Sequence, residues 1–201
     1  MSNIIGIVNY GIAGNIHSIK KAVERAGGNT LVINKPSDFS LVDKLIIPGV
    51  GSFKDGMQEL ENDNFINPIQ EFSKPILGIC LGMQLLSNLS EEGKEKGLGW
   101  IDAKTVKFEL DDKSLSIPHM GWNKTNPTNT KDIYQKLGEN RFYFVHTYHV
   151  VCNDEKNILA TANYGKEFTC SIYKDNIYGV QFHPEKSHKF GMQLLKNFGE
   201  L

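Results

Sequence analysis

Short runs of branched apolar residues alternate with amphipathic stretches over the first half of the chain. The runs have the length of buried strands and lie at 4–8, 30–33, 45–47 and 76–79. Between them, apolar residues recur at helical spacing, first over 16–26 and then over 57–72. This alternation predicts a parallel sheet joined by right-handed helical crossovers, with ligands bound beyond the carboxyl ends of the strands.

The pattern changes after Trp100, which follows a polar stretch over 90–99 that is typical of an exposed loop. Strand-like segments separated by Asn, Asp and Gly turns then lie at 106–110, 142–145, 150–152, 159–162, 168–173 and 177–182. We expect several of them to be antiparallel and to extend or cover the parallel sheet. Residues 117–123 are expected to form a compact loop, and a last helix is predicted from about His188.

Cys80 lies between the apolar run 76–79 and a helical pattern, with Gly78 and Gly82 two residues away on either side. This is the layout of a nucleophile elbow, with Cys where many hydrolases have Ser. The glycines remove Cβ atoms that would collide where a strand turns sharply into a helix. A helix N-terminus behind the sulfur favours the thiolate, which is the reactive form. The alternative is that Cys80 is simply a small buried hydrophobic residue.

The segment 177–187 contains His183-Pro184-Glu185. Side chains of a strand alternate between its faces, so we expect Gln181, His183 and Glu185 to share one face. Glu185 can then accept a ring hydrogen of His183 and support its protonated form. An H-P-E segment alone is typical of a surface turn. Together with an elbow cysteine, it completes a nucleophile, a base and an orienting carboxylate.

Other candidate sites are weaker. The glycine-bearing loop 9–15 lacks the G-x-G-x-x-G spacing of a dinucleotide site, so no cofactor is expected. His146 and His149 have a spacing that would suit a metal pair, but no third ligand accompanies them. We therefore predict no metal and a structural or substrate-shaping role for these histidines. For His119, an ordering hydrogen bond and a ligand role stay equally open.

Composition narrows the function classes. With 22 basic and 23 acidic residues and no basic run, the chain is not expected to bind nucleic acid or an anionic membrane surface. No apolar stretch approaches the ~20 residues of a membrane span. The 3 cysteines lack C-x-x-C spacing, which argues against disulfides and structural zinc. We expect a reduced, cytoplasmic protein in which residues 1–201 form a single domain.

Several segments together closely resemble the class I glutamine amidotransferases, in particular their histidine-biosynthesis glutaminases. The matching segments cover essentially the whole chain and are 48–53 (PGVGSF), 78–84 (GICLGMQ), 118–123 (PHMGWN), 143–148 (YFVHTY) and 179–187 (GVQFHPEKS). The resemblance implies an α/β, flavodoxin-like three-layer fold with a mostly parallel central sheet and antiparallel additions.

The resemblance also implies the roles of individual residues. Cys80 would attack the side-chain amide of L-glutamine, with His183 as base and Glu185 as its orienting partner. Backbone amides of Val50 and Leu81 would supply oxyanion donors. The glutamine pocket would be lined by Gly49, Gly51, Gln84, Thr147 and Tyr148.

A partner is implied as well. The family's glutaminases form a heterodimer with a (β/α)₈-barrel synthase subunit that consumes the ammonia. The positions expected to face that subunit are Asn15, Trp122, Asn123, Tyr143 and Lys186. The first loop departs from the family's D-Y-G-x-G-N, because Asn9 replaces Asp and Ile12-Ala13 adds a residue. This departure keeps one rival open, a paralogous glutaminase that supplies a sugar-amidating synthetase. A second rival, from a different class, is a non-enzymatic flavodoxin-like binding module.

Overall fold

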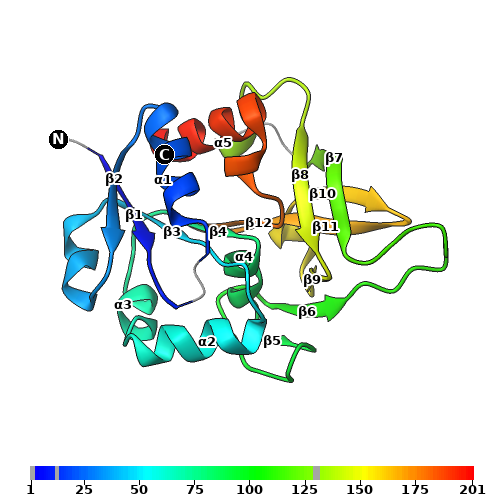
Figure 1. Ribbon diagram of the computed structural model, residues 1–201, viewed down its shortest axis with the longest axis horizontal. Coiled ribbons are helices and arrows are strands. Elements are labelled where there is room, and N and C mark those ends of the chain that lie inside the picture. Colours follow the sequence, from blue (N-terminus) through cyan, green and yellow to red (C-terminus); the bar gives the residue numbers. More distant parts are fainter. Residues whose placement is uncertain (1–2, 12–13, 129–131) are drawn as a thin grey trace.

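A mixed β-sheet organises the chain in this computed structural model, which describes residues 3–11, 14–128 and 132–201 (Figure 1). Its parallel half has the strands in the order β2 (Asn29–Ile33), β1 (Ile4–Val8), β3 (Lys44–Ile47), β4 (Ile76–Ile79) and β12 (Ile177–Val180). The predicted parallel sheet is thus confirmed. Its last member, β12, comes from the far end of the sequence and lies directly beside β4.

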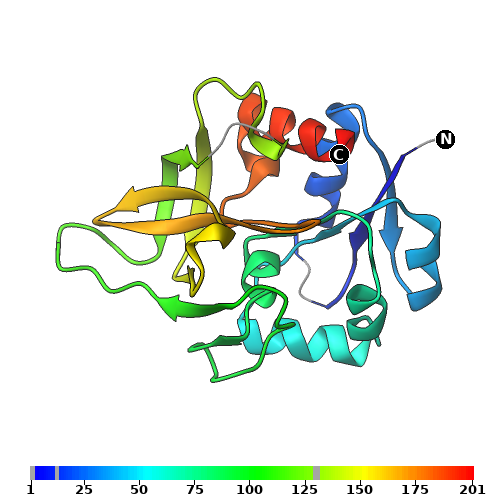
Figure 2. The same ribbon diagram turned by 180° about the vertical axis from the view of Figure 1, so that it is seen from behind.

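Helices cover both faces of the parallel half (Figures 1 and 2). One face carries α1 (Ile16–Arg25) and α5 (His188–Glu200), and the other carries α2 (Phe53–Asn62), α3 (Ile66–Gln70) and α4 (Leu81–Leu85). Alternate strand residues separate the two cores: Ile46 packs with the α1 and α5 side, whereas Leu45 and Ile47 pack with the α2 side. The result is the expected three-layer α/β arrangement.

The second half of the chain adds strands that pair mostly antiparallel. They are β5 (Leu89–Ser90), β6 (Ala103–Lys107), β7 (His119–Pro127), β8 (Arg141–His146), β9 (Tyr148–Cys152), β10 (Ile158–Tyr164) and β11 (Lys166–Lys174). From β12 the sheet continues through β11, β10 and β7 to β8, while β9 and β6 branch off β11. The expected antiparallel extension is confirmed.

Four local predictions were wrong. Residues 117–123 are not a compact loop, because 119–127 form β7, whose polar and aromatic residues alternate between a covered and an open face. The helix predicted over 57–72 is two helices, interrupted where Asn64 has φ 57°. Segment 90–99 is not wholly a loop, since Ser90 belongs to β5. The strand expected at 106–110 lies earlier, at Ala103–Lys107.

Candidate active site

The turn at Cys80 is strained and closely packed. Cys80 has φ 54°, a left-handed conformation that non-glycine residues seldom adopt, and it separates β4 from α4. Its N–H donates to the Val180 carbonyl of β12 at 2.8 Å. A Cβ on Gly82 would lie 1.8 Å from the Ile47 carbonyl oxygen, and one on Gly78 would lie 2.6 Å from the Gly82 oxygen. The steric reason predicted for both glycines is confirmed.

His183 and Glu185 meet by a different route from the predicted one. The strand ends at Val180, and Pro184–Lys186 form a 3₁₀ turn, so the expected shared strand face was wrong. The turn instead folds the carboxylate back onto the ring, with Glu185 Oε1 2.8 Å from His183 Nδ1. Both side chains are buried, at 1% and 3% exposed. The His183 N–H also donates to the Tyr143 carbonyl at 2.9 Å, which ties the turn to β8.

The charge state of His183 depends on two neighbours. Burial by itself lowers the pKa of the imidazole, but hydrogen bonding to Cys80 and Glu185 and their negative charges outweigh burial and raise the pKa to about 10. Nε2 of the ring has no hydrogen-bond partner among the described residues, and Cys80 is one of the two groups that raise the pKa of the ring. The raised pKa favours a protonated His183 beside the elbow cysteine.

A pocket of about 230 Å³ opens over the sulfur. It is lined by Val50, Gly51, Cys80, Leu81, Gln84, Glu92, Pro118, Val145, His146, Thr147 and Tyr148. Every predicted pocket and oxyanion residue except Gly49 therefore lies on its wall. Sequence reasoning missed Glu92, because nothing in its charged segment distinguishes it from Glu91 or Glu95. Only the fold brings Glu92 to the cavity.

The candidate oxyanion donors are turned away from the sulfur. The Leu81 N–H donates to the Gly49 carbonyl at 3.4 Å. In a planar trans peptide the C=O and the following N–H point in opposite directions. The Val50 N–H therefore points away from Leu81. In this conformation neither amide is free to meet an oxyanion above Cys80.

A cluster of buried, neutral histidines borders the pocket, and one of them, His146, lines it. Burial lowers the pKa of His119 to about 4 and that of His149 to about 4, and it lowers the pKa of His146 to about 3. No set of at least three His, Cys, Asp or Glu side chains within 3–11, 14–128 and 132–201 could hold a metal ion. The histidine rings pack around Phe108. The distance from the Phe108 ring centroid is 4.5 Å for His149 and 5.3 Å for His146.

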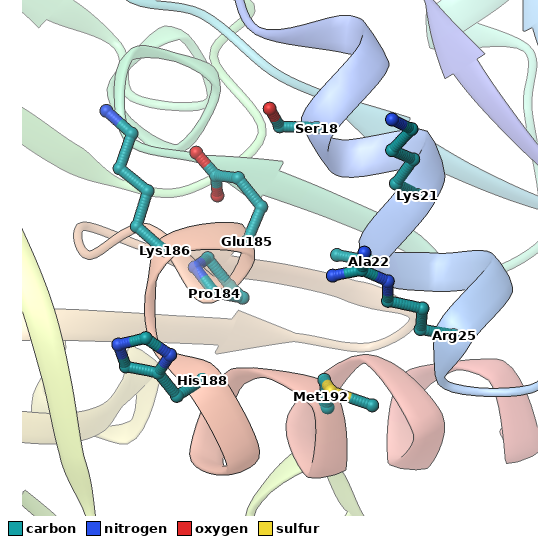
Figure 3. Close-up of a pocket in the computed structure, with 9 residues that line it drawn as sticks. All are labelled: Ser18, Lys21, Ala22, Arg25, Pro184, Glu185, Lys186, His188 and Met192. Carbon is teal, nitrogen blue, oxygen red and sulfur yellow. The ribbon is translucent and has the colours of Figure 1, made fainter.

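The five positions expected to face a partner differ in their exposure and in their contacts. Trp122 and Tyr143 are paired across β7 and β8, and Trp122 is 37% exposed. Lys186 is exposed beside a hollow of about 260 Å³ between α1 and α5, which Glu185 also lines (Figure 3). Asn15 directly precedes α1. Asn123, by contrast, already donates its side-chain amide to the Asn163 carbonyl at 2.7 Å.

In the first loop, Asn9 donates its side-chain amide to Asn34 Oδ1 at 2.8 Å. The extra residue noted at Ile12-Ala13 falls outside the described residues. Among the described helices, none is long and apolar enough to cross a membrane.

The fold and the site together define a class of protein, and comparison with known proteins agrees. Residues 8–200 match the family described as Glutamine amidotransferase class-I, and the chain belongs to this family. A solved glutamine amidotransferase shares the fold, with a TM-score of 0.70 at 18% identity, over 95% of this chain and 98% of that one.

The names of two curated relatives are more specific than the family description. The chain is 52% identical to "Imidazole glycerol phosphate synthase subunit HisH 2" of Methanococcus maripaludis, over 97% of this chain and 98% of the relative. It is 46% identical to the protein of the same name from Pseudomonas aeruginosa, over 98% of this chain and 100% of the relative.

Proposed function

We propose that residues 1–201 form one glutaminase unit, the ammonia-supplying subunit of a cytoplasmic imidazole glycerol phosphate synthase. It hydrolyses L-glutamine to glutamate and ammonia. The ammonia passes to a (β/α)₈-barrel synthase subunit, which makes imidazole glycerol phosphate and AICAR for histidine biosynthesis. The observation that carries the proposal is the buried His183–Glu185 pair, in which the pKa of the ring is raised by Glu185 and by Cys80, a residue that lines the pocket. Relatives named for this synthase at 52% and 46% identity support it.

The chemistry follows from the protonation states. The Cys80 thiolate attacks the side-chain amide carbon of glutamine, and the resulting tetrahedral oxyanion collapses to a γ-glutamyl thioester as ammonia leaves with a proton from His183. His183, now neutral, takes a proton from water, whose oxygen attacks the thioester carbonyl. The thiolate departs and glutamate is released. Glu185 holds the ring in one tautomer and stabilises its charged form in both halves of the reaction.

Turnover requires a change at the oxyanion site. Rotation of the Gly49–Val50 peptide releases the Leu81 N–H from the Gly49 carbonyl and brings the Val50 N–H toward the sulfur. A single oxyanion donor contributes about 10²–10³ in rate. The described conformation therefore corresponds to a slow enzyme. A partner that binds the face carrying Trp122, Tyr143 and Lys186, and favours the rotated peptide, would accelerate it.

Glutamine recognition uses the walls of the pocket. Glu92 is the carboxylate among the lining residues, and its Oε2 is oriented by the Phe53 N–H at 2.8 Å. It is suited to pair with the α-ammonium group of glutamine. Gln84 has both amide hydrogens engaged, by the Tyr148 carbonyl and by Gln181 Oε1, each at 3.1 Å. Only its oxygen is left to accept from the substrate.

The test is ammonia release from glutamine, measured with and without a (β/α)₈-barrel partner. Wild type should turn over slowly alone and faster with the partner, whereas Cys80→Ala should be inactive in both conditions. Cys152→Ala is the matched control, because Cys152 is a free, half-buried thiol outside the pocket. Turnover that survives Cys80→Ala would remove the catalytic assignment of Cys80. Absence of turnover in wild type, with and without the partner, would favour the binding-module alternative.

The specific observation that favours a second candidate is the altered first loop, with Asn9 in place of Asp. It would suit a glutaminase that supplies a sugar-amidating synthetase. The two candidates differ in which synthetase accelerates glutamine hydrolysis. Acceleration by a sugar-amidating enzyme alone would replace the histidine-pathway assignment while leaving the glutaminase chemistry intact.

A further inference from the structure

Gln181 is a buried polar residue that the mechanism above does not use. Its side chain is fully buried, and Nε2 lies 3.7 Å from Cys80 Sγ, within reach of a hydrogen bond to sulfur. A second polar group near the sulfur is the Val145 carbonyl, at 3.9 Å, which can only accept. We propose that Gln181 is a catalytic residue, whose amide N–H donates to the Cys80 thiolate and stabilises it. The proposal rests on the proposed glutaminase function.

A chain of buried hydrogen bonds fixes which end of the Gln181 amide faces the sulfur. The Tyr148 backbone carbonyl can only accept, so the Gln84 atom 3.1 Å from it must be the amide nitrogen. That nitrogen also lies 3.1 Å from Gln181, so the Gln181 atom facing it must be the oxygen. The remaining end of Gln181, the NH₂ group, is left for the sulfur. The Tyr148 carbonyl therefore determines, through Gln84, that Gln181 presents its NH₂ group to the sulfur.

The histidine cluster holds the same carbonyl from its other side. His146 Nδ1 lies 2.8 Å from the Tyr148 oxygen and must donate to it, which leaves Nε2 of this neutral ring as an acceptor. His119 Nδ1 then donates to that Nε2 at 2.9 Å. Asn123 donates to His119 Nε2 at 3.3 Å and completes the chain. His146 and His119 are thus positioning residues for the carbonyl that orients Gln84 and Gln181.

The arrangement matters because an N–H donor favours the thiolate over the thiol. A thiol can make its own S–H bond to the Val145 carbonyl, whereas a thiolate is repelled by that oxygen and attracted by the Gln181 N–H. Hydrogen bonds to a charged partner are about twice as strong as those between neutral groups. Removing the donor should therefore shift the balance towards the unreactive thiol.

The experiment measures the alkylation of Cys80 by iodoacetamide as a function of pH, quantified on the Cys80 peptide by mass spectrometry. Gln181→Met removes the donor at similar volume. It should slow alkylation at pH 6 by about five- to tenfold and move the inflection of the profile upward by nearly one pH unit. Gln181→Glu keeps the acceptor for Gln84 but puts a carboxylate beside the sulfur, so it should slow alkylation further. Gln58→Met, at an exposed amide, is the matched control and should change nothing.

This readout separates the inference from the proposed function. Alkylation depends on the sulfur alone and not on glutamine turnover. If the pH profile of Cys80 alkylation depends on Gln181 but the protein has no glutaminase activity, this inference is upheld and the proposed function is wrong. If Gln181→Met lowers glutamine turnover but leaves the alkylation profile in place, Gln181 is only structural and the inference is wrong. If Gln181→Met does not fold, Gln84→Met is the second variant, because it removes the group that orients Gln181. An unchanged alkylation profile of Cys80 in the Gln84→Met variant also overturns the proposal.

Discussion

Two regions beside the pocket are built on opposite principles. The first, the charged wall, consists of the Cys80 turn, which lines the pocket, and the His183–Glu185 turn, and its backbone includes a residue at φ 54°. The second, the neutral wall, consists of β7, β8 and β9 and carries neutral histidines, of which His146 lines the pocket. Histidines on both walls are buried, yet the pKa of His183 is raised to about 10 and that of His146 is lowered to about 3. Burial alone keeps an imidazole neutral, and an adjacent anion reverses the outcome.

The largest expected effect removes the anion from the charged wall. Glu185→Gln keeps the shape of the side chain but takes away the charge that orients and stabilises His183. Glutamine hydrolysis in the presence of the partner should fall by about 10³–10⁴-fold, as for other triads that lose their carboxylate. Glu167→Gln, at an exposed carboxylate that also accepts one side-chain hydrogen bond, is the control. If glutamine hydrolysis fell by less than tenfold, the Glu185 charge would not be what distinguishes the charged wall from the neutral one.

The next effect tests the backbone of the charged wall. Gly82→Ala places a Cβ against the Ile47 carbonyl, a rigid backbone atom, so the free energy of unfolding should fall by about 3 kcal/mol or more. The measurement is urea unfolding. Gly199→Ala, in α5, is the control, because a Cβ there would lie at an ordinary contact distance of 3.6 Å from the Ile5 side chain and should be neutral or stabilising. Equal effects of the two substitutions would show that the elbow is not tightly packed.

The neutral wall should make the protein sensitive to acid. His149 has its pKa lowered from 6.5 to about 4 in the folded state, so only the unfolded chain takes up a proton between these values. Stability from this group is present above pH 6.5 and is lost as the pH falls to 4, by at most about 1.4 kcal/mol per pH unit. His149→Phe should flatten the pH dependence of the unfolding free energy in this window, since the Nε2 atom it removes has no partner among the described residues.

His183 should act with the opposite sign. Its pKa is raised from 6.5 to about 10, so its contribution to stability is complete below pH 6.5 and disappears as the pH rises to 10. His183→Gln should therefore reduce the loss of stability on the alkaline side while leaving the acid side unchanged. Matching pH curves for the His149 and His183 variants would contradict the comparison between the two walls.

The smallest effect concerns substrate affinity at the rim. Glu92→Gln retains an oxygen for the Phe53 N–H but removes the charge proposed to bind the ammonium group of glutamine. The KM for glutamine should rise about tenfold, the equivalent of one modest charge-assisted hydrogen bond, with kcat little changed. Glu91→Gln, next in the chain but exposed and bonded to the Lys107 N–H, should leave KM unchanged. A fall in kcat alone would place Glu92 outside the binding contacts.

The sequence predicted features whose cause is local. The apolar runs that became β1 and β4 are bounded correctly, and the two glycines around Cys80 are needed for the reason given. It did not predict β7, because this antiparallel strand leaves one face open, and alternation with Gly121 and Asn123 resembles a loop.

Predictions that depended on contacts between residues far apart in the sequence were less accurate. The His183–Glu185 pair was expected, but from strand alternation, whereas Pro184 starts a 3₁₀ turn once His183 is bonded to β8. Glu92 reaches the pocket only through the pairing of β5 with β6. The orientation of Gln181 depends on Gln84, 97 positions earlier in the chain, and no local pattern encodes such a contact.

The position of β12 has a consequence for biosynthesis of the molecule. This strand occupies the middle of the sheet, between β4 and β11, and carries the imidazole to a thiol translated about a hundred codons earlier. A nascent chain on the ribosome that stops short of residue 177 leaves one side of β4 unpaired and lacks both His183 and Glu185. Under the proposed mechanism, release of ammonia must therefore await nearly complete translation.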